Sequence, residues 1–100
     1  MSLFEALADP HRRQILDLLR DGERAAGDLV GALPLSQPGA SKHLRVLRDA
    51  GLVTVRKDAQ RRIYRLAPEC LAELDAWLAP YRKFWSGRLD GFEDHLNKES

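Results

Sequence analysis

The chain consists of segments in which apolar residues recur at helical spacing, separated by short breaks of Pro and Gly. Asp9-Pro10 predicts the start of a helix, because Asp can cap the free amide groups and Pro fits the first turn. Asp21-Gly22 predicts its end. A shorter helix is predicted over 25–33, closed by Pro34. The inward faces of these two helices comprise Ile15, Leu16, Leu18 and Leu19, then Leu29, Val30 and Leu33.

A third helix is predicted over 36–50. Ser36 is placed to cap it, and Gly51 lies where a helix C-terminus favours a left-handed residue. Its buried stripe has the spacing i, i+4, i+7 and comprises Ala40, Leu44 and Leu47. Two helices joined by a turn of a few residues predict a helix-turn-helix, an arrangement whose second helix can enter a DNA groove.

Strand patterns follow the third helix. Residues 52–56 and 62–66 have strand character, and the second stretch alternates polar and apolar side chains. The polar and basic stretch 57–61 between them predicts a β-hairpin wing. From Pro68 the chain returns to helix, which we expect Pro80 to kink or locally break. The pattern therefore predicts a mainly α fold with a small β-hairpin, as a single domain over 1–100.

Charge is unevenly distributed along the chain, although the formal net charge is only +1. From Ser36 to Leu66 there are eight Lys and Arg and two acidic residues, a formal charge of +6, and the remaining residues carry −5. Such a chain can present a positive face to a polyanion while the rest keeps it soluble. The alternative, a merely solvated charged face, predicts mixed signs. The cationic segment favours nucleic acid as a partner.

The candidate DNA contacts lie on the third helix and the wing. Arg and Lys can hydrogen-bond to guanine edges, Gln can bond to adenine, and Ser can donate or accept in the major groove. Helix N-terminal amides can also hold a phosphate. His43 suits packing or a phosphate contact better than metal binding. The candidates are Ser36, Gln37, Ser41, Lys42, His43, Arg45, Arg48, Lys57, Arg61 and Arg62.

Several motifs, in order and spacing, resemble the ArsR/SmtB repressor family over about residues 7–68. They are Ala8-Asp9-Pro10-His11-Arg12-Arg13-Gln14-Ile15-Leu16, then Ser36-Gln37-Pro38 with Ser41-Lys42-His43-Leu44, Leu47, Ala50-Gly51-Leu52-Val53, and Arg61-Arg62-Ile63-Tyr64-Arg65-Leu66. The resemblance implies a dimeric winged helix-turn-helix with five helices and a hairpin before the last. It also implies DNA reading by the 36–50 helix and derepression by a signal, so an unidentified small-molecule effector is a further expected partner.

The sequence departs from the metal-sensing members of this family. Thiol-type sensors carry Cys-x-Cys-Asp-Leu before the reading helix, and the matching stretch here is Ala25-Ala26-Gly27-Asp28-Leu29. Zinc-type members place paired Asp/His ligands on the last helix, whereas Asp75 is followed two positions on by Trp77, and only His95 lies near the end. The chain thus resembles the metal-independent, often autoregulatory branch, and we expect no metal and no cofactor.

The remaining side chains suggest no further chemistry. The single Cys70 cannot form an internal disulfide and is expected to be a buried thiol rather than a sensor. No Ser/His/Asp set or Gly-rich phosphate loop occurs, so we expect no catalytic residue and no enzyme. No apolar run approaches the roughly 20 residues that span a bilayer, and Met1–Glu5 lacks signal-peptide features. We therefore expect a cytoplasmic protein that does not contact membranes.

The last helix is unusually aromatic, with Trp77, Tyr81, Phe84, Trp85 and Phe92. A homodimer interface, to which residues 69–97 contribute, would bury these rings. The alternative is a hydrophobic ligand pocket lined by the same aromatics, and both can hold together. The expected interface comprises Leu3, Phe4, Leu7, Leu74, Trp77, Leu78, Tyr81, Trp85, Leu89 and Phe92.

Three functions fit these features. The favoured one is a sequence-specific transcriptional repressor, a candidate autorepressor, that binds a palindromic operator as a homodimer. The second is a small-molecule or redox sensor whose last helix captures the ligand. The third is a protein-interaction module that kept the fold and lost DNA binding, and the +6 segment argues against it.

Overall fold

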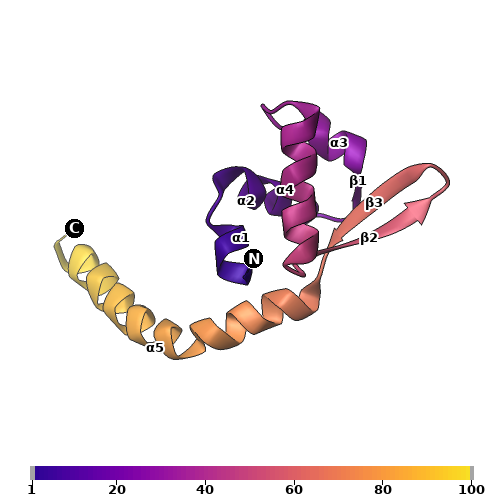
Figure 1. The fold of residues 1–100 in the computed structure, drawn as a ribbon. Helices are drawn as coiled ribbons and strands as arrows, with labels where there is room; N and C mark the ends of the chain where they lie inside the picture. The colour runs from indigo at the N-terminus through magenta and orange to yellow at the C-terminus, as the bar shows by residue number, and fades with distance from the viewer. Residues whose placement is uncertain (1, 100) are drawn as a thin grey trace.

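The structure, a computed structural model, describes the backbone of residues 2–99 and the side chains of residues 2–86. A small antiparallel sheet with the strand order β1-β3-β2 lies at one side of the helices, and its β2–β3 hairpin projects beyond them (Figure 1). This arrangement confirms the predicted mainly α fold with a β-hairpin. The elements are α1 (Leu3–Leu7), α2 (Pro10–Leu19), β1 (Arg24–Ala25), α3 (Ala26–Gly31), α4 (Gln37–Asp49), β2 (Val53–Asp58), β3 (Arg61–Leu66) and α5 (Pro68–Glu99).

The helices α2 and α4 begin at the residues that the sequence predicts. The Asp9 carboxylate accepts hydrogen bonds from the backbone N–H groups of His11 and Arg12, at 2.8 and 3.2 Å. Ser36 Oγ accepts one from the N–H of Gly39, at 3.3 Å. Each oxygen thus satisfies amide groups that have no partner within the helix.

The end of α4 is fixed by backbone bonds around Gly51, which has a φ of +81°. The N–H of Leu52 donates to the carbonyl of Leu47, and the N–H of Gly51 donates to that of Arg48, both at 3.0 Å. These two bonds form a Schellman motif, which requires a left-handed residue and therefore favours Gly. The sequence prediction that Gly51 takes a left-handed conformation at the end of this helix is confirmed.

The hairpin is longer and its loop shorter than predicted. Asp58 still pairs with Arg61, so only Ala59 and Gln60 form the loop between β2 and β3. A two-residue hairpin loop demands positive φ angles, and Ala59 accordingly takes φ +58°. The sequence pattern missed this extension because polar residues at the tip of an exposed hairpin show no apolar alternation.

The strand β1 was not predicted. It consists of Arg24 and Ala25, which pair with Tyr64 and Ile63 of β3. Two residues are too short for a strand periodicity, and only the partner strand reveals the pairing. Because the chain is extended there, α3 begins at Ala26 and is shorter than the predicted 25–33 helix.

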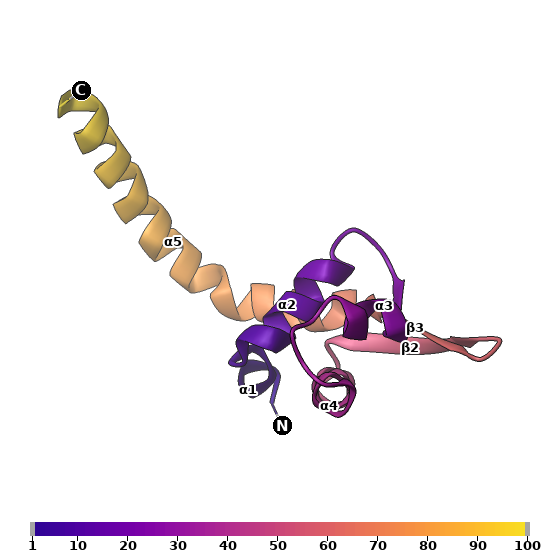
Figure 2. The ribbon, with the colours of Figure 1, turned by 90° about the horizontal axis from the view of Figure 1, so that it is seen from above.

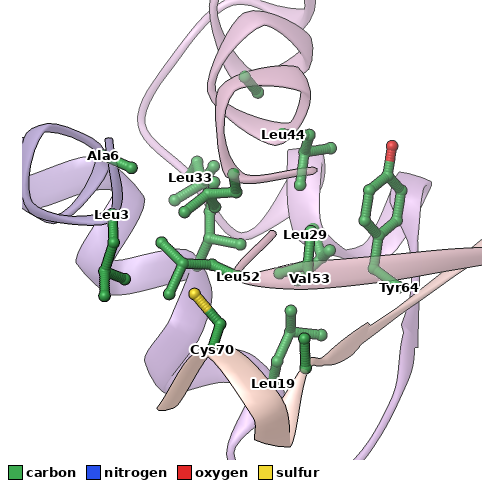
Figure 3. Packing of buried hydrophobic residues seen from close by; sticks show 14 residues of the cluster. Leu3, Ala6, Leu19, Leu29, Leu33, Leu44, Leu52, Val53, Tyr64 and Cys70 are labelled. Carbon is green, nitrogen blue, oxygen red and sulfur yellow. The ribbon is translucent and has the colours of Figure 1, made fainter. Parts of the chain in front are cut away.

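The core lies where α1, α2, α3 and α4 meet the sheet and the start of α5 (Figure 3). Of the predicted inward residues, Ile15, Leu19, Leu29 and Leu33 are buried, whereas Leu16, Leu18 and Val30 are half-buried. The stripe of Ala40, Leu44 and Leu47 is buried as predicted. Full burial of one Leu or Ile stabilises the fold by about 1.5–3 kcal/mol, so this stripe firmly attaches α4 to the body.

The helix α5 is continuous through Pro80, so of the two outcomes that the sequence predicts there, a kink or a local break, the break does not occur. Figure 1 shows instead that α5 changes direction in its orange part, the colour of residues near 80. Figure 2 shows α5 running away from the other elements. The radius of gyration is 17.5 Å, against about 13 Å for a compact chain of this length, which reflects that extension. No helix among the described residues has the length and hydropathy that crossing a membrane requires.

Candidate nucleic-acid interface

One side of α4 and the strand β3 form a groove of about 310 Å³, closed on its third side by α3. Its apolar floor includes Val30, Leu44 and Tyr64. Half of the DNA-binding candidates come together there, and their charge and amide groups could meet phosphates and base edges. These polar lining residues are Gln37, Ser41, Arg45 and Arg48 from α4 and Arg62 from β3.

Four other candidates are exposed but do not line this groove. Ser36 is exposed and uses its oxygen to cap α4. Lys42 is exposed on α4, and Lys57 and Arg61 are exposed on the hairpin. Arg61 lines a second hollow beside the start of α3, which it shares with Arg62. The cationic surface therefore extends from α4 along the hairpin.

An ion pair that the sequence did not predict joins β2 of the hairpin to the residue before β1. Arg56 donates to Glu23 through Nη2 at 2.6 Å and through Nε at 3.3 Å. This hydrogen bond lowers the pKa of Glu23 and raises that of Arg56. Arg65 Nε similarly donates to Thr54 Oγ1 on the neighbouring strand, at 3.0 Å. Both arginines thus bind within the protein, which fits their absence from the predicted DNA contacts.

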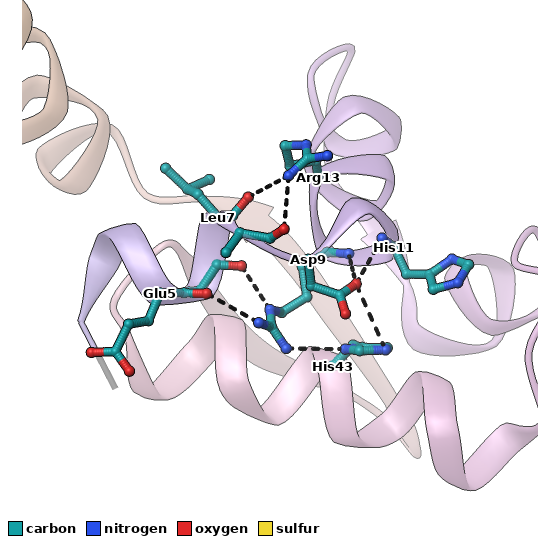
Figure 4. Close-up of polar contacts among 9 residues, drawn as sticks. Glu5, Leu7, Asp9, His11, Arg13 and His43 are labelled. Atoms are coloured by element: carbon teal, nitrogen blue, oxygen red, sulfur yellow. Dashed lines mark hydrogen bonds and ion pairs between the residues drawn. The ribbon is translucent and has the colours of Figure 1, made fainter.

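His43 differs from the other candidates because its ring is half-buried and engaged within the protein (Figure 4). Its Nδ1 lies 3.3 Å from Arg12 Nη1, and its Nε2 lies 4.0 Å from Asp9 Oδ1. The ring of His11 is also close, with centroids 5.9 Å apart. The ring faces the α1–α2 turn rather than the groove, which favours the packing role predicted for His43, and a phosphate contact by His43 stays a prediction.

A second surface is aromatic and combines α1 with α5. Phe4 packs edge-on against Trp77 at a centroid distance of 5.2 Å, and Trp77 lies 4.9 Å from Tyr81. These three rings nevertheless remain 48%, 51% and 50% exposed. Phe84, which the predicted interface omitted, is 61% exposed. The residues of the predicted dimer interface that lie on this surface are therefore exposed to solvent.

The other predicted interface residues have different environments. Leu3 is buried in the core of the chain itself. Leu7, Leu74 and Leu78 are half-buried, and Trp85 is 37% exposed. The side chains of Leu89 and Phe92 lie outside the described residues. The exposed rings are therefore available for an interface, whereas Leu3 is covered within the chain itself.

Cys70 is buried, and its Sγ lies 3.8 Å from the carbonyl oxygen of Ala50 (Figure 3). Burial raises the pKa of this thiol, and the negative charge of Glu73 raises it further. A raised pKa disfavours the reactive thiolate, which agrees with the expectation of a structural cysteine. Among the side chains that the structure describes, no three His, Cys, Asp or Glu form a group that could hold a metal ion.

Sequence reasoning missed Arg12 and Glu23, because both act on residues distant in the chain. Arg12 reaches His43, 31 positions away, and Glu23 reaches Arg56, 33 positions away. No periodicity reports such pairs. The only available signal was that Arg12 belongs to the motif around Asp9-Pro10 that resembles the family.

Comparisons with known proteins agree with this geometry. Residues 9–55 match the family described as bacterial regulatory protein, arsR family. An HTH-type transcriptional regulator of Mycobacterium tuberculosis is 41% identical over 96 residues, which cover 96% of this chain and 87% of that protein. The transcriptional repressor SdpR of Bacillus subtilis is 35% identical over 77% of this chain and 86% of its own length.

The fold is also similar to that of solved structures. A crystal structure described as a possible transcriptional regulator for arsenical resistance superimposes with a TM-score of 0.74 at 43% identity, over 82% of this chain and 85% of that one. The chain therefore belongs to the ArsR family of bacterial regulatory proteins and is a DNA-binding transcriptional regulator with a winged helix-turn-helix fold.

Proposed function

We propose that this chain represses transcription by binding a palindromic operator as a homodimer. The observation that carries the proposal is the groove in which side chains of α4 and β3 converge. Its arginines suit the phosphate backbone of any sequence, while its amide and hydroxyl groups suit base edges. Repression, rather than activation, is supported by the similarity to SdpR.

The proposed contacts divide into base reading and phosphate binding. The exposed residues in the first turns of α4 enter the major groove, as those of recognition helices do. The end of α4 and the hairpin lie against the backbone and fix the register. We assign base reading to Gln37, Ser41, Lys42 and Arg45, and phosphate binding to Arg48, Lys57, Arg61 and Arg62.

The aromatic surface of α1 and α5 supports the homodimer. Contiguous exposed aromatic rings are uncommon on monomers and mark interaction sites. A two-fold contact through this surface covers the rings of both copies at once. It also presents two α4 helices to one duplex, for which the half-sites of a palindrome lie about one helical turn apart, ~34 Å.

DNA binding in this proposal needs no metal. Ala25 and Gly27 stand where thiol-type relatives have their cysteine pair, and neither side chain carries a donor atom. We expect operator affinity to be the same with and without EDTA, and after addition of Zn²⁺ or As(III). A tenfold or larger change at micromolar metal, abolished by Cys70→Ser or His95→Ala, would show a metal sensor instead.

Selection from a pool of random duplexes tests the function directly. The wild-type chain should enrich a palindromic sequence and bind it more tightly than a scrambled duplex by a factor of about 10³ or more. Arg45→Ala should weaken the enrichment at a particular base position. Failure of the wild type to enrich any sequence would contradict the proposed function.

A further inference from the structure

Arg12 of α2 binds two carbonyl groups near the C-terminal end of α1. Because α1 spans only five residues, most of its carbonyl groups have no partner inside the helix. Arg12 donates through Nε to the carbonyl of Ala6 at 2.6 Å and through Nη2 to that of Glu5 at 3.1 Å. The guanidinium group is thereby held at a defined place beside the α1–α2 turn.

The third nitrogen of this guanidinium group, Nη1, lies close to a side chain of α4. Arg12 Nη1 lies 3.3 Å from Nδ1 of His43. A guanidinium group has no lone pair to accept with, so Arg12 donates and His43 Nδ1 accepts. The ring proton is then on Nε2, which faces Asp9 Oδ1 at 4.0 Å. Figure 4 shows His43 contacted on both sides of its ring by these groups.

This contact lies on a different flank of α4 from the groove. His43 follows Ser41 by two positions, about 200° around a helix. The buried stripe of Ala40, Leu44 and Leu47 holds α4 against the core, but apolar packing limits rotation about the helix axis less sharply than a directional hydrogen bond does. A bond on the far flank therefore determines how Ser41 and Arg45 face outward.

We propose that Arg12 is a positioning residue for DNA recognition, which fixes the rotation of α4 through its hydrogen bond to His43. The inference rests on the proposed function, because it assigns base reading to α4. It also gives α1 a second role. The same short helix packs Phe4 against Trp77, so it lies between the aromatic surface and the reading helix.

The test compares affinity for the selected operator with affinity for a scrambled duplex of the same length. Arg12→Met should lower the ratio of the two affinities about tenfold, while affinity for the scrambled duplex changes little. Arg13→Met is the matched control, because Arg13 donates to the carbonyls of Leu7 and Ala8 in the same turn. Its contacts lie within that turn, so its variant should keep the ratio.

If Arg12→Met is unstable, three further variants still test the proposal. Arg12→Lys retains the charge but cannot bridge three acceptors in one plane, so it should fold and still lose much of the ratio. His43→Asn keeps an acceptor near the position of Nδ1 and should retain most of the ratio that His43→Phe loses. Melting temperatures of all variants, measured in parallel, separate loss of folding from loss of discrimination.

The double variant Arg12→Met/His43→Phe distinguishes a shared role from two separate ones. It should lower the ratio no further than the more severe single variant, because both remove the same bond. Additive losses, or an equal loss of affinity for both duplexes, would overturn the positioning role. A wild type that prefers no duplex would instead contradict the proposed function, so the two failures are distinguishable.

Discussion

The groove between α4 and β3 and the aromatic surface of α1 and α5 differ in how favourably water solvates them. Arginine, amide and hydroxyl groups line the groove between α4 and β3, and water solvates them well. The surface of α1 and α5 instead exposes Phe4, Trp77 and Tyr81. The arginine, amide and hydroxyl groups of the groove stay solvated in the isolated chain, whereas covering aromatic rings lowers the free energy by about 25 cal/mol per Å². Changes in the groove should therefore alter DNA affinity, and changes in the aromatic surface should alter assembly.

The largest effect is expected from Trp85→Glu. A carboxylate placed in an aromatic interface without a partner costs several kcal/mol, so the dimer dissociation constant should rise about 100-fold or more. Sedimentation at micromolar protein should show a dimeric wild type and a monomeric or aggregated variant. Ala79→Glu, an exposed change on another side of α5, should leave the dimer intact. A monomeric wild type would contradict the role given to this surface.

The groove should divide into two kinds of residue. Arg45→Ala should cost about 1–3 kcal/mol of operator binding and relax the preference at one base position. Arg62→Ala should weaken all sequences alike and reduce the salt dependence of log K by roughly one unit. Titrations of operator and scrambled duplexes at several salt concentrations measure both quantities. If Arg45→Ala reduces affinity with unchanged preference, α4 does not read bases.

A smaller effect is expected at Asp9, which lies between the two surfaces. Its pKa is raised by desolvation, but bonds from the Arg12 and His11 amides and the charges of His43 and Arg12 outweigh this and hold it below 3.8. The carboxylate therefore stabilises the fold above pH ~4, and that contribution is lost as the pH falls through the lowered pKa.

Two substitutions at Asp9 separate the cap from the charge. Asp9→Ala should cost about 1 kcal/mol at pH 7, while Asp9→Asn retains the cap and should cost less. Urea unfolding at pH 7 and pH 3 measures the difference. The loss of stability on acidification should be smaller in Asp9→Asn than in the wild type. If the wild type and Asp9→Asn lose equal stability on acidification, the charge of Asp9 does not stabilise the fold.

The smallest effect is expected at the hairpin tip. An L-residue at the φ of +58° found at Ala59 costs about 1–2 kcal/mol, but Gly loses more conformational entropy on folding, so Ala59→Gly should be neutral or slightly stabilising. Ala72→Gly, in the interior of α5, should instead destabilise by up to about 1 kcal/mol. Thermal unfolding of the two variants compares the signs. Clear destabilisation by Ala59→Gly would mean that the loop conformation is different in solution.

Local signals explain why much of the fold could be predicted. Asp9, Ser36 and Gly51 act on residues a few positions away, so their roles follow from spacing alone. The strand β1 and the Arg12–His43 bond depend on partners more than thirty residues distant, which no local pattern reports. Pro80 shows a third case. A helix can bend at Pro and continue, so a breaking residue predicts a bend more securely than an end.

Hydroxyl-radical footprinting of the wild type on its selected operator examines both surfaces at once. If α4 and the hairpin bind DNA and the aromatic surfaces join two copies, two protected segments should appear with centres about 10 base pairs or a multiple apart. Sedimentation of the same complex should give two chains per duplex, and Trp85→Glu should lose the paired protection. A single protected segment occupied by one wild-type chain would contradict the assignment of the two surfaces.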